Sequence, residues 1–233
     1  EMGQNKSLYL AYESLAARSE ALDPARKKAL ENALRDFRLS GVDLPEEQKA
    51  RFKEISNELS RVTSKFQENL LDATNAWSKL ITEADQLSGL PASALELAAQ
   101  TASQHEQEGW MLNLEFPSYF AVITYADNRE LRREMYEAYC TRASDKGPHA
   151  GVYDNTEIMG EILALRHEQA LLLGFNNYAE RSLTKKMART TEEVMNFLQD
   201  LAQRTRPQAR RELDELQAFA REHYSVEGLE SWD

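Results

Sequence analysis

The stretch from Pro45 to Ile81 constrains the fold of this chain most strongly, because no glycine or proline interrupts it after its first residue. Its apolar side chains recur at alternating steps of three and four residues. This spacing predicts a long amphipathic helix whose apolar stripe must be buried. We favour a seam in a helical bundle over a ligand groove. The stripe comprises Phe52, Ile55, Leu59, Val62, Phe66, Leu70, Ala73, Ala76, Trp77 and Leu80, with Asn69 as its one polar member.

Helical spacing extends over most of the remaining chain. Asp23 and Pro24 form a typical helix start, and Gly41 stands where a glycine commonly ends a helix. Because only residues 42–44 link that helix to the long one, we expect the two to run antiparallel. Further helices are expected at 6–17, at 92–107, at 129–143 with Asp127 or Asn128 as the cap, at 155–173 as a buried helix, and at 176–188. Residues 118–125 could form a strand or a helix, and we favour a helix. The last long helix starts at Thr190 or Thr191, and Pro207 interrupts or kinks it.

One segment has a different period. Residues 109–116, GWMLNLEF, alternate apolar and other side chains, which predicts a strand. A lone strand is not stable, so it must pair with a segment that the sequence does not identify. The expected fold is therefore mainly α, with long antiparallel helices and one small β element. We expect a single unit over 1–233, with a helical hairpin region at 1–107, the β element and a turn at 109–126, and a second helical region at 128–233.

The charge balance limits the kinds of partner that this chain is expected to bind. The 233 residues include 39 acidic and 28 basic side chains, for a net charge of −11. Nucleic acids and anionic membranes repel such a chain unless it has a basic patch, and none is evident. Cys140, the one cysteine, excludes an internal disulfide and a cysteine-rich zinc site, and we interpret it as a small core residue. With no apolar run of membrane-spanning length and no signal-peptide pattern at the start, we expect a cytoplasmic protein.

Two of the four histidines precede glutamate, but neither completes a zinc-peptidase motif. HExxH needs a second histidine four residues on, and Gly109 and Leu171 stand in those places after His105 and His167. No carboxylate lies three residues before any histidine, which excludes Glu-x-x-His chemistry as well. We therefore interpret the histidines as surface or capping residues. We expect no catalytic residue and no bound metal in this chain.

Weaker candidates for binding remain. Arg142 and Arg181, near predicted loops, could contact an anion. A dense aromatic group could pack around the β element, which we favour, or form a peptide-contacting surface. Its members are Trp110, Phe116, Tyr119, Phe120 and Tyr125. No motif identifies substrate-binding residues, so these stay unknown.

Long segments of the chain resemble the thimet-oligopeptidase-type zinc metallopeptidases. They are FPSYFAVITYADNRELRREMYEAYCTRAS at 116–144 and EILALRHEQALLLGFNNY at 161–178. Shorter matches are NALRDF at 32–37, LSG at 39–41, LDAT at 71–74, residues 202–207 and the closing Trp232-Asp233, all in collinear order. The resemblance implies a mainly helical fold that encloses a deep, narrow channel. It also implies hydrolysis of short peptides by a zinc-bound water.

In that family, HExxH and a glutamate ligand lie in the C-terminal half, and neither is present here. The resemblance thus implies that this chain is an interior part of the N-terminal half and is inactive alone. Its partners would be short peptides and the missing C-terminal catalytic half. The family's N-terminal helices form a wall of the substrate channel and restrict access to it. The alternative is a stand-alone helical module that binds a partner helix or peptide.

Overall fold

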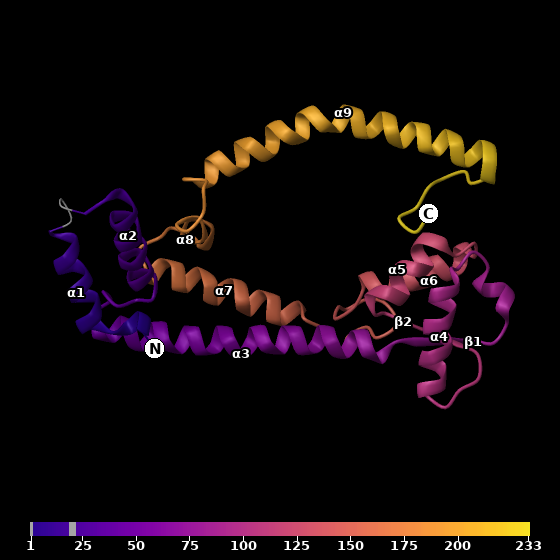
Figure 1. Cartoon of the computed structure of the whole chain (residues 1–233), viewed down its shortest axis with the longest axis horizontal. Helices are drawn as coiled ribbons and strands as arrows, with labels where there is room; N and C mark the ends of the chain where they lie inside the picture. Colours follow the sequence, from indigo (N-terminus) through magenta and orange to yellow (C-terminus); the bar gives the residue numbers. More distant parts are fainter. Residues whose placement is uncertain (1, 19–21) are drawn as a thin grey trace. The chain divides into compact units, whose positions relative to one another are not determined.

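The computed structural model describes residues 2–18 and 22–233. Its helices α1 to α9 and one two-stranded sheet confirm the mainly α fold with a small β element (Figure 1). The chain forms two compact units: residues 1–63 with 160–196, and residues 64–159 with 197–233. These units do not follow the ranges 1–107, 109–126 and 128–233. The division of the chain into those regions stays a prediction.

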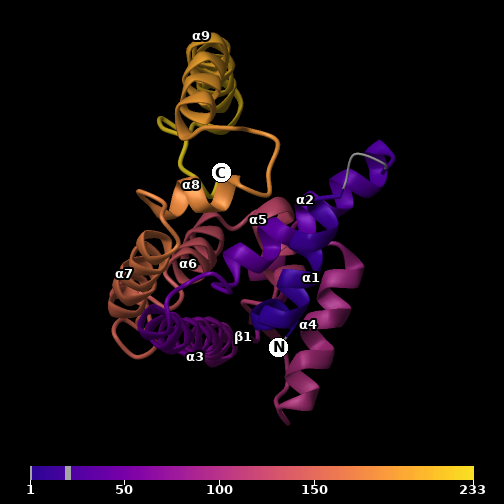
Figure 2. The same cartoon turned by 90° about the vertical axis from the view of Figure 1, so that its left-hand side faces the viewer.

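The first unit contains α1 (Lys6–Ala16) and α2 (Pro24–Leu39), which pack side by side (Figure 2). A short 3-10 helix at Met2–Gln4 precedes them. The predicted signals of α2 are confirmed. The Asp23 side chain accepts a hydrogen bond from the Arg26 backbone N–H, and Gly41 has a φ of 78° after the helix end. The cluster between the two helices consists of Tyr9, Leu30, Leu34, Phe37 and Val42.

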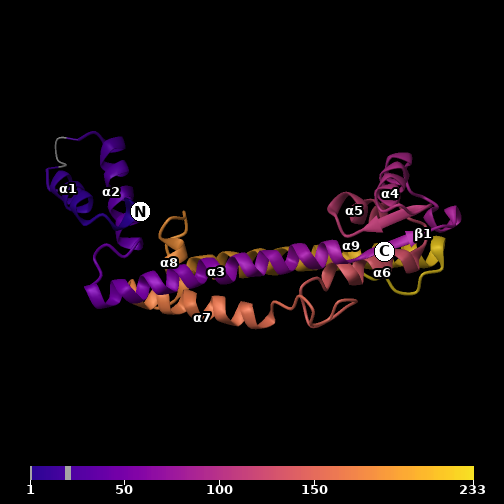
Figure 3. The same ribbon diagram turned by 90° about the horizontal axis from the view of Figure 1, so that it is seen from below.

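The long helix is α3 (Glu46–Ala76), and α7 (Thr156–Leu172) runs beside it (Figure 3). Two ion pairs join the helices in the first unit. Arg51 donates two hydrogen bonds, of 2.6 and 2.7 Å, to the Glu168 carboxylate. Arg61 pairs with Glu161 at 3.4 Å. Residue numbers rise on α3 as they fall on α7, so these helices are antiparallel.

The short link after Gly41 predicted α2 as the antiparallel partner of α3. Among residues 2–18 and 22–233, no hydrogen bond or ion pair joins α2 to α3. The apolar face of α2 is already buried, because Leu30, Leu34 and Phe37 pack against α1. Link length alone is therefore a poor guide to the partner here.

In the second unit, the sheet pairs β1 (Ser78–Ile81) with β2 (Trp110–Asn113) in antiparallel register, Ser78 opposite Asn113 and Ile81 opposite Trp110. β1 is the strand partner that the sequence left unidentified. The prediction that the helix continues to Ile81 is wrong, since α3 ends at Ala76. Leu80 fits the helical stripe by spacing but is 39% exposed, whereas Ile81 is 3% exposed. Pairing satisfies the backbone of both strands, which a longer helix would leave unpaired in β2.

Helices α4 (Ala92–Gln104) and α5 (Phe116–Tyr125) pack against β2, and α6 (Arg129–Cys140) packs against α5. A 3-10 helix at Ala84–Leu87 precedes α4. Of the two predicted caps of α6, Asp127 and Asn128, the cap is Asn128, which accepts hydrogen bonds from the backbone N–H groups of Glu130 and Leu131. The core of the unit centres on side chains that are almost completely buried: Leu112, Leu114, Val122 and Met135.

Two helices carry exposed apolar side chains. The helix predicted at 155–173 is α7, but the prediction that it is buried is wrong, because Leu163 is 65% exposed and Leu171 is 52% exposed. The short α8 (Tyr178–Leu183) leads to α9 (Thr191–Tyr224), which continues through Pro207 and buries only Ala220. Its exposed apolar residues are Met195, Phe197, Leu198, Leu201, Leu213, Leu216 and Phe219. None of the described helices combines the length and hydropathy needed to cross a membrane.

The last residues of the chain are held by α6 in the second unit. The Asp233 carboxylate accepts hydrogen bonds from Arg129, at 2.7 and 2.8 Å, and from Arg132 at 3.1 Å. Arg132 also donates to the Trp232 carbonyl at 2.7 Å. Hydrogen bonding by Arg129, reinforced by the Glu230 backbone N–H and Arg132, outweighs the opposing effect of burial and lowers the pKa of Asp233 to about 2.

Replacing Asp233 by asparagine should lower stability in a pH-dependent way. The folded pKa lies below the ordinary value near 4, so the carboxylate stabilises the fold above about pH 4 and loses this effect as pH falls towards 2. At neutral pH, Asp233→Asn should cost about 1 to 2 kcal/mol, less than the full shift because the site is partly hydrated. Urea unfolding between pH 2 and pH 7 measures this.

Asp214→Asn is the matched control, because Asp214 is exposed and has no ion-pair partner among the described residues. Equal effects of the two substitutions at pH 7, or a wild-type advantage that persists unchanged at pH 2, would contradict the assignment.

Candidate functional site

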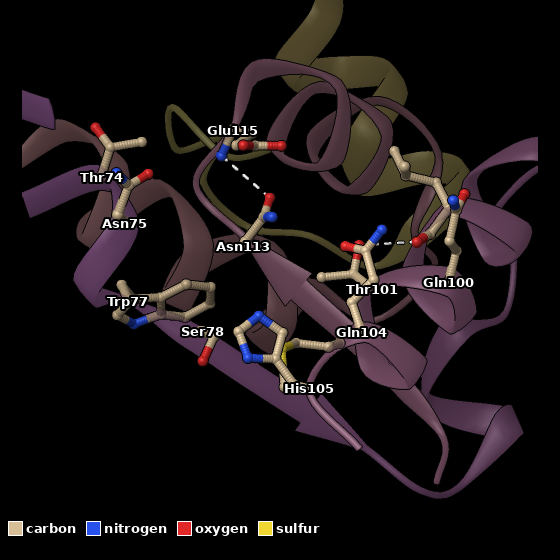
Figure 4. A pocket seen from close by; sticks show the side chains of 12 residues that line it. Thr74, Asn75, Trp77, Ser78, Gln100, Thr101, Gln104, His105, Asn113 and Glu115 are labelled. Carbon is tan, nitrogen blue, oxygen red and sulfur yellow. Dashed lines mark hydrogen bonds between the residues drawn. The ribbon is translucent and has the colours of Figure 1, made fainter. Parts of the chain in front are cut away.

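A pocket of about 410 Å³ opens in the second unit where α3, α4 and the sheet meet (Figure 4). The end of α3 and the start of β1 supply one side, α4 supplies another, and β2 with the residues after it supplies the third. The lining residues are Thr74, Asn75, Trp77, Ser78, Leu97, Gln100, Thr101, Gln104, His105, Met111, Asn113 and Glu115.

The α4 side of this pocket follows from helix geometry. Leu97, Gln100, Thr101 and Gln104 are spaced three, four and seven residues apart from the first, which places them on one face of α4. His105 is the C-cap residue of the same helix. A sequence reader could find this polar face from its spacing. The position of Trp77 in the pocket could not be predicted in this way, because Trp77 continues the apolar stripe of α3 and was interpreted as a helical residue.

The polar groups of the pocket are mainly neutral and mostly unused. The side chains of Asn75, Gln100 and Gln104 make no hydrogen bond to other described residues. The Asn113 side-chain oxygen accepts a bond of 3.1 Å from the Glu115 backbone N–H, which leaves its amide N–H₂ available (Figure 4). The pocket therefore offers several amides that can both donate and accept.

Three apolar side chains, Trp77, Leu97 and Met111, lie among the lining residues. Trp77 and Met111 are buried. Glu115 is the one carboxylate in the lining. Neutral polar walls with a few buried apolar side chains suit a ligand that carries hydrogen-bonding groups, such as a peptide backbone.

The histidines lie where surface and capping residues lie. His105, His167 and His223 are exposed, and the His149 ring lies 6.2 Å from that of Tyr153. Within residues 2–18 and 22–233, no three or more His, Cys, Asp or Glu side chains are grouped in a way that could hold a metal ion. The residues present thus do not fit a zinc centre, and that no residue of this chain is catalytic stays a prediction.

Arg142 is occupied by contacts within the second unit. Its guanidinium lies 3.6 Å from the centre of the Tyr139 ring and donates to the Thr74 hydroxyl at 2.9 Å. Tyr139 in turn stacks on Tyr119 at 3.8 Å. This arginine therefore tethers α6 to α3 and is poorly placed to contact an anion.

The aromatic group divides between core and surface. Trp110 and Tyr119 pack against the core cluster, as we favoured. Phe116, Phe120 and Tyr125 are at least half exposed, and the first two stack at 5.4 Å. The interpretation of Cys140 as a core residue is wrong. It is exposed, because the inward face of α6 is formed by Leu131, Met135 and Ala138.

Comparison with known proteins shows which family and which relatives the sequence of this chain resembles. A model described as peptidase family M3 matches residues 122–233. Over its whole length, the chain is 52% identical to oligopeptidase A of Salmonella typhimurium and 51% identical to that of Escherichia coli. The dipeptidyl carboxypeptidase of Escherichia coli is 26% identical over 98% of the chain.

These similarities confirm the resemblance to the oligopeptidases, with greater identity to oligopeptidase A than to this dipeptidyl carboxypeptidase. The chain spans 34% of the length of the two bacterial oligopeptidases that it matches.

Proposed function

We propose that this chain is a segment of the N-terminal half of a zinc metalloendopeptidase that hydrolyses short peptides, as the name oligopeptidase A implies for its relatives. The observation that carries the proposal is 52% identity over the whole chain to one such protein. Zinc in the parent enzyme would supply Lewis-acid activation of water for peptide hydrolysis. The described residues offer no zinc site, so the metal would be held by the part of the parent beyond this chain.

We assign to this segment the role of a wall of the substrate channel. Two features support the assignment. The pocket at Trp77 has neutral amides and buried apolar side chains that suit a peptide backbone. The uncovered apolar side chains of α7 and α9 suit burial against a further part of the same protein, which we propose is the catalytic half.

The remaining assignments belong to the same proposal. The parent would be a cytoplasmic enzyme whose partners are short peptides, and neither nucleic acid nor membrane. The acidic net charge of −11 supports the exclusion of polyanionic partners. The alternative function is a stand-alone helical module that binds a peptide or protein without catalysis. The exposed stripe of α9 is the feature that favours it.

Reading the coding DNA past the codon for Asp233 separates the two functions. An open frame that reaches HExxH, with a glutamate ligand further on, supports the zinc peptidase. A stop codon after Asp233 overturns the peptidase proposal and leaves the binding module.

The 233-residue chain alone should hydrolyse no short peptide, with or without added zinc, because it contains no HExxH. The full-length protein should hydrolyse an internally quenched fluorescent peptide, and a chelator should abolish that activity. The rate of fluorescence increase measures both. Chelator-sensitive hydrolysis by the isolated chain would show that the catalytic groups lie within it, contrary to the proposal.

A further inference from the structure

A second pocket, of about 360 Å³, lies in the first unit and is not part of the site described above. Its walls come from the 3-10 helix at Met2–Gln4, the end of α2, α3, α7 and α8. No aspartate or glutamate lines it. Its polar side chains come from Gln4, Ser40, Lys53, Ser56, Asn57, Gln169 and Arg181.

Two cations line this pocket without a compensating carboxylate. Lys53 and Arg181 form no ion pair with any carboxylate in the described part of the chain. Nearby basic residues are compensated, since Arg51 pairs with Glu168 and Lys185 pairs with Asp36. In a chain of net charge −11, two uncompensated cations at one pocket create a local positive potential.

Arg181 is held in a way that leaves hydrogen-bonding capacity unused. Its Nε atom is buried and has no hydrogen-bond partner among the described residues. Its guanidinium lies 5.5 Å from the centre of the Tyr178 ring, and Arg166 lies 5.0 Å from the centre of the same ring. A buried donor without a partner is costly, so the site would be more stable with an acceptor present. Arg166 adds further positive charge to this region.

The remaining polar groups are well placed to act as donors. Gln169 is 6% exposed and donates from its amide to the Ser56 hydroxyl at 3.3 Å. That hydroxyl donates to the Phe52 carbonyl at 2.8 Å, and these two hydrogen bonds hold the side chains of Ser56 and Gln169 in position. The amide of Asn57 makes no hydrogen bond within the described residues. A guanidinium, an ammonium and a free amide thus surround a cavity without a competing carboxylate.

We propose that this pocket binds a small oxyanion, either inorganic phosphate or the carboxylate of an organic molecule. The planar guanidinium of Arg181 would pair with two oxygens, and Lys53 would supply a point charge. The sequence had already singled out Arg181 as an anion candidate, and the structure supplies Lys53 and Gln169. The inference does not depend on peptidase activity, because every group it uses lies in the first unit.

The test is calorimetric titration of the full-length protein with inorganic phosphate, with N-acetyl-leucine, and with the amide of N-acetyl-leucine, at constant ionic strength in chloride. We expect saturable binding of phosphate or of the free carboxylate, and none of the amide. The double variant Lys53→Gln/Arg181→Gln should weaken that binding at least tenfold. A metal centre elsewhere in the protein would bind the anion equally in the wild type and in the double variant. The difference in affinity between these two proteins therefore measures binding at the pocket.

The matched control is Arg206→Gln/Arg210→Gln, which removes the same charge from exposed positions on α9. Thermal unfolding confirms that each variant is folded, and Arg181→Lys tests the planar group alone. Binding of phosphate only would assign the site to phosphate, and binding of N-acetyl-leucine only would assign it to a carboxylate. No saturable binding, or equal weakening in the control, would overturn the proposal.

Discussion

Truncating Leu112 to alanine should lower the free energy of unfolding by about 2 to 5 kcal/mol, the range found when a buried leucine is cut back to its Cβ. Leu112 is 2% exposed and lies at the centre of β2, opposite Lys79 of β1. Its side chain belongs to the core cluster of the second unit together with Val122 and Met135. The loss combines the apolar area no longer buried with the cavity that remains.

Urea unfolding followed by tryptophan fluorescence measures the change. All three tryptophans, Trp77, Trp110 and Trp232, lie in the second unit, so the signal reports on the unit that is altered. Leu80→Ala in the adjacent strand is the control, because the chemistry is the same but Leu80 is 39% exposed. We expect that control to cost less than about 1 kcal/mol. Equal losses for the two leucines would contradict the assignment of the core.

Replacing Asn155 by alanine should cost about 2 to 4 kcal/mol, because two buried groups lose their partners at once. Asn69 is the polar residue on the apolar stripe of α3, and it is 7% exposed. It donates to the Asn155 side-chain oxygen at 2.9 Å, and Asn155 donates to the Phe66 carbonyl at 3.0 Å. Asn155 is itself 2% exposed. The polar interruption of the stripe is thus satisfied by the residue just before α7.

The double variant Asn69→Leu/Asn155→Leu tests this mechanism. If the loss in Asn155→Ala comes from an unpaired Asn69 amide, removing both amides should recover part of the stability. Gln67→Ala, an exposed neighbour on α3 without a hydrogen bond among the described residues, should change stability by less than about 0.5 kcal/mol. The single variants Asn69→Leu and Asn155→Leu complete the comparison. If the double variant loses as much stability as the two single variants together, the pair is not coupled.

The candidate pocket at Trp77 was only partly predictable. The polar face of α4 could be read from spacing, because residues three and four apart share a helix face. Trp77 was misassigned, since the helical period of α3 continues through Trp77 and Leu80 while the backbone leaves the helix after Ala76. Asn113 joins the pocket through the pairing of β1 with β2, and no local pattern reports which strand a segment will choose.

The sequence by itself determined the features that depend on neighbouring residues. The extent of most of α3, the Asp23 and Asn128 caps and the glycine at the end of α2 follow from interactions within a few positions. The family resemblance likewise resides in the order of residues. These features need no knowledge of distant partners, and the structure and the comparisons confirm them.

Only the tertiary structure decided which distant segments meet. β1 pairs with a strand about thirty residues later, and Arg51 of α3 binds Glu168, 117 positions away. It also decided that Cys140 and much of α7 are exposed, and that Lys53, Gln169 and Arg181 surround one pocket. The physical reason is that an apolar stripe or a free backbone edge specifies that it must be covered, while the choice among possible partners depends on how all the faces of the chain compete for burial.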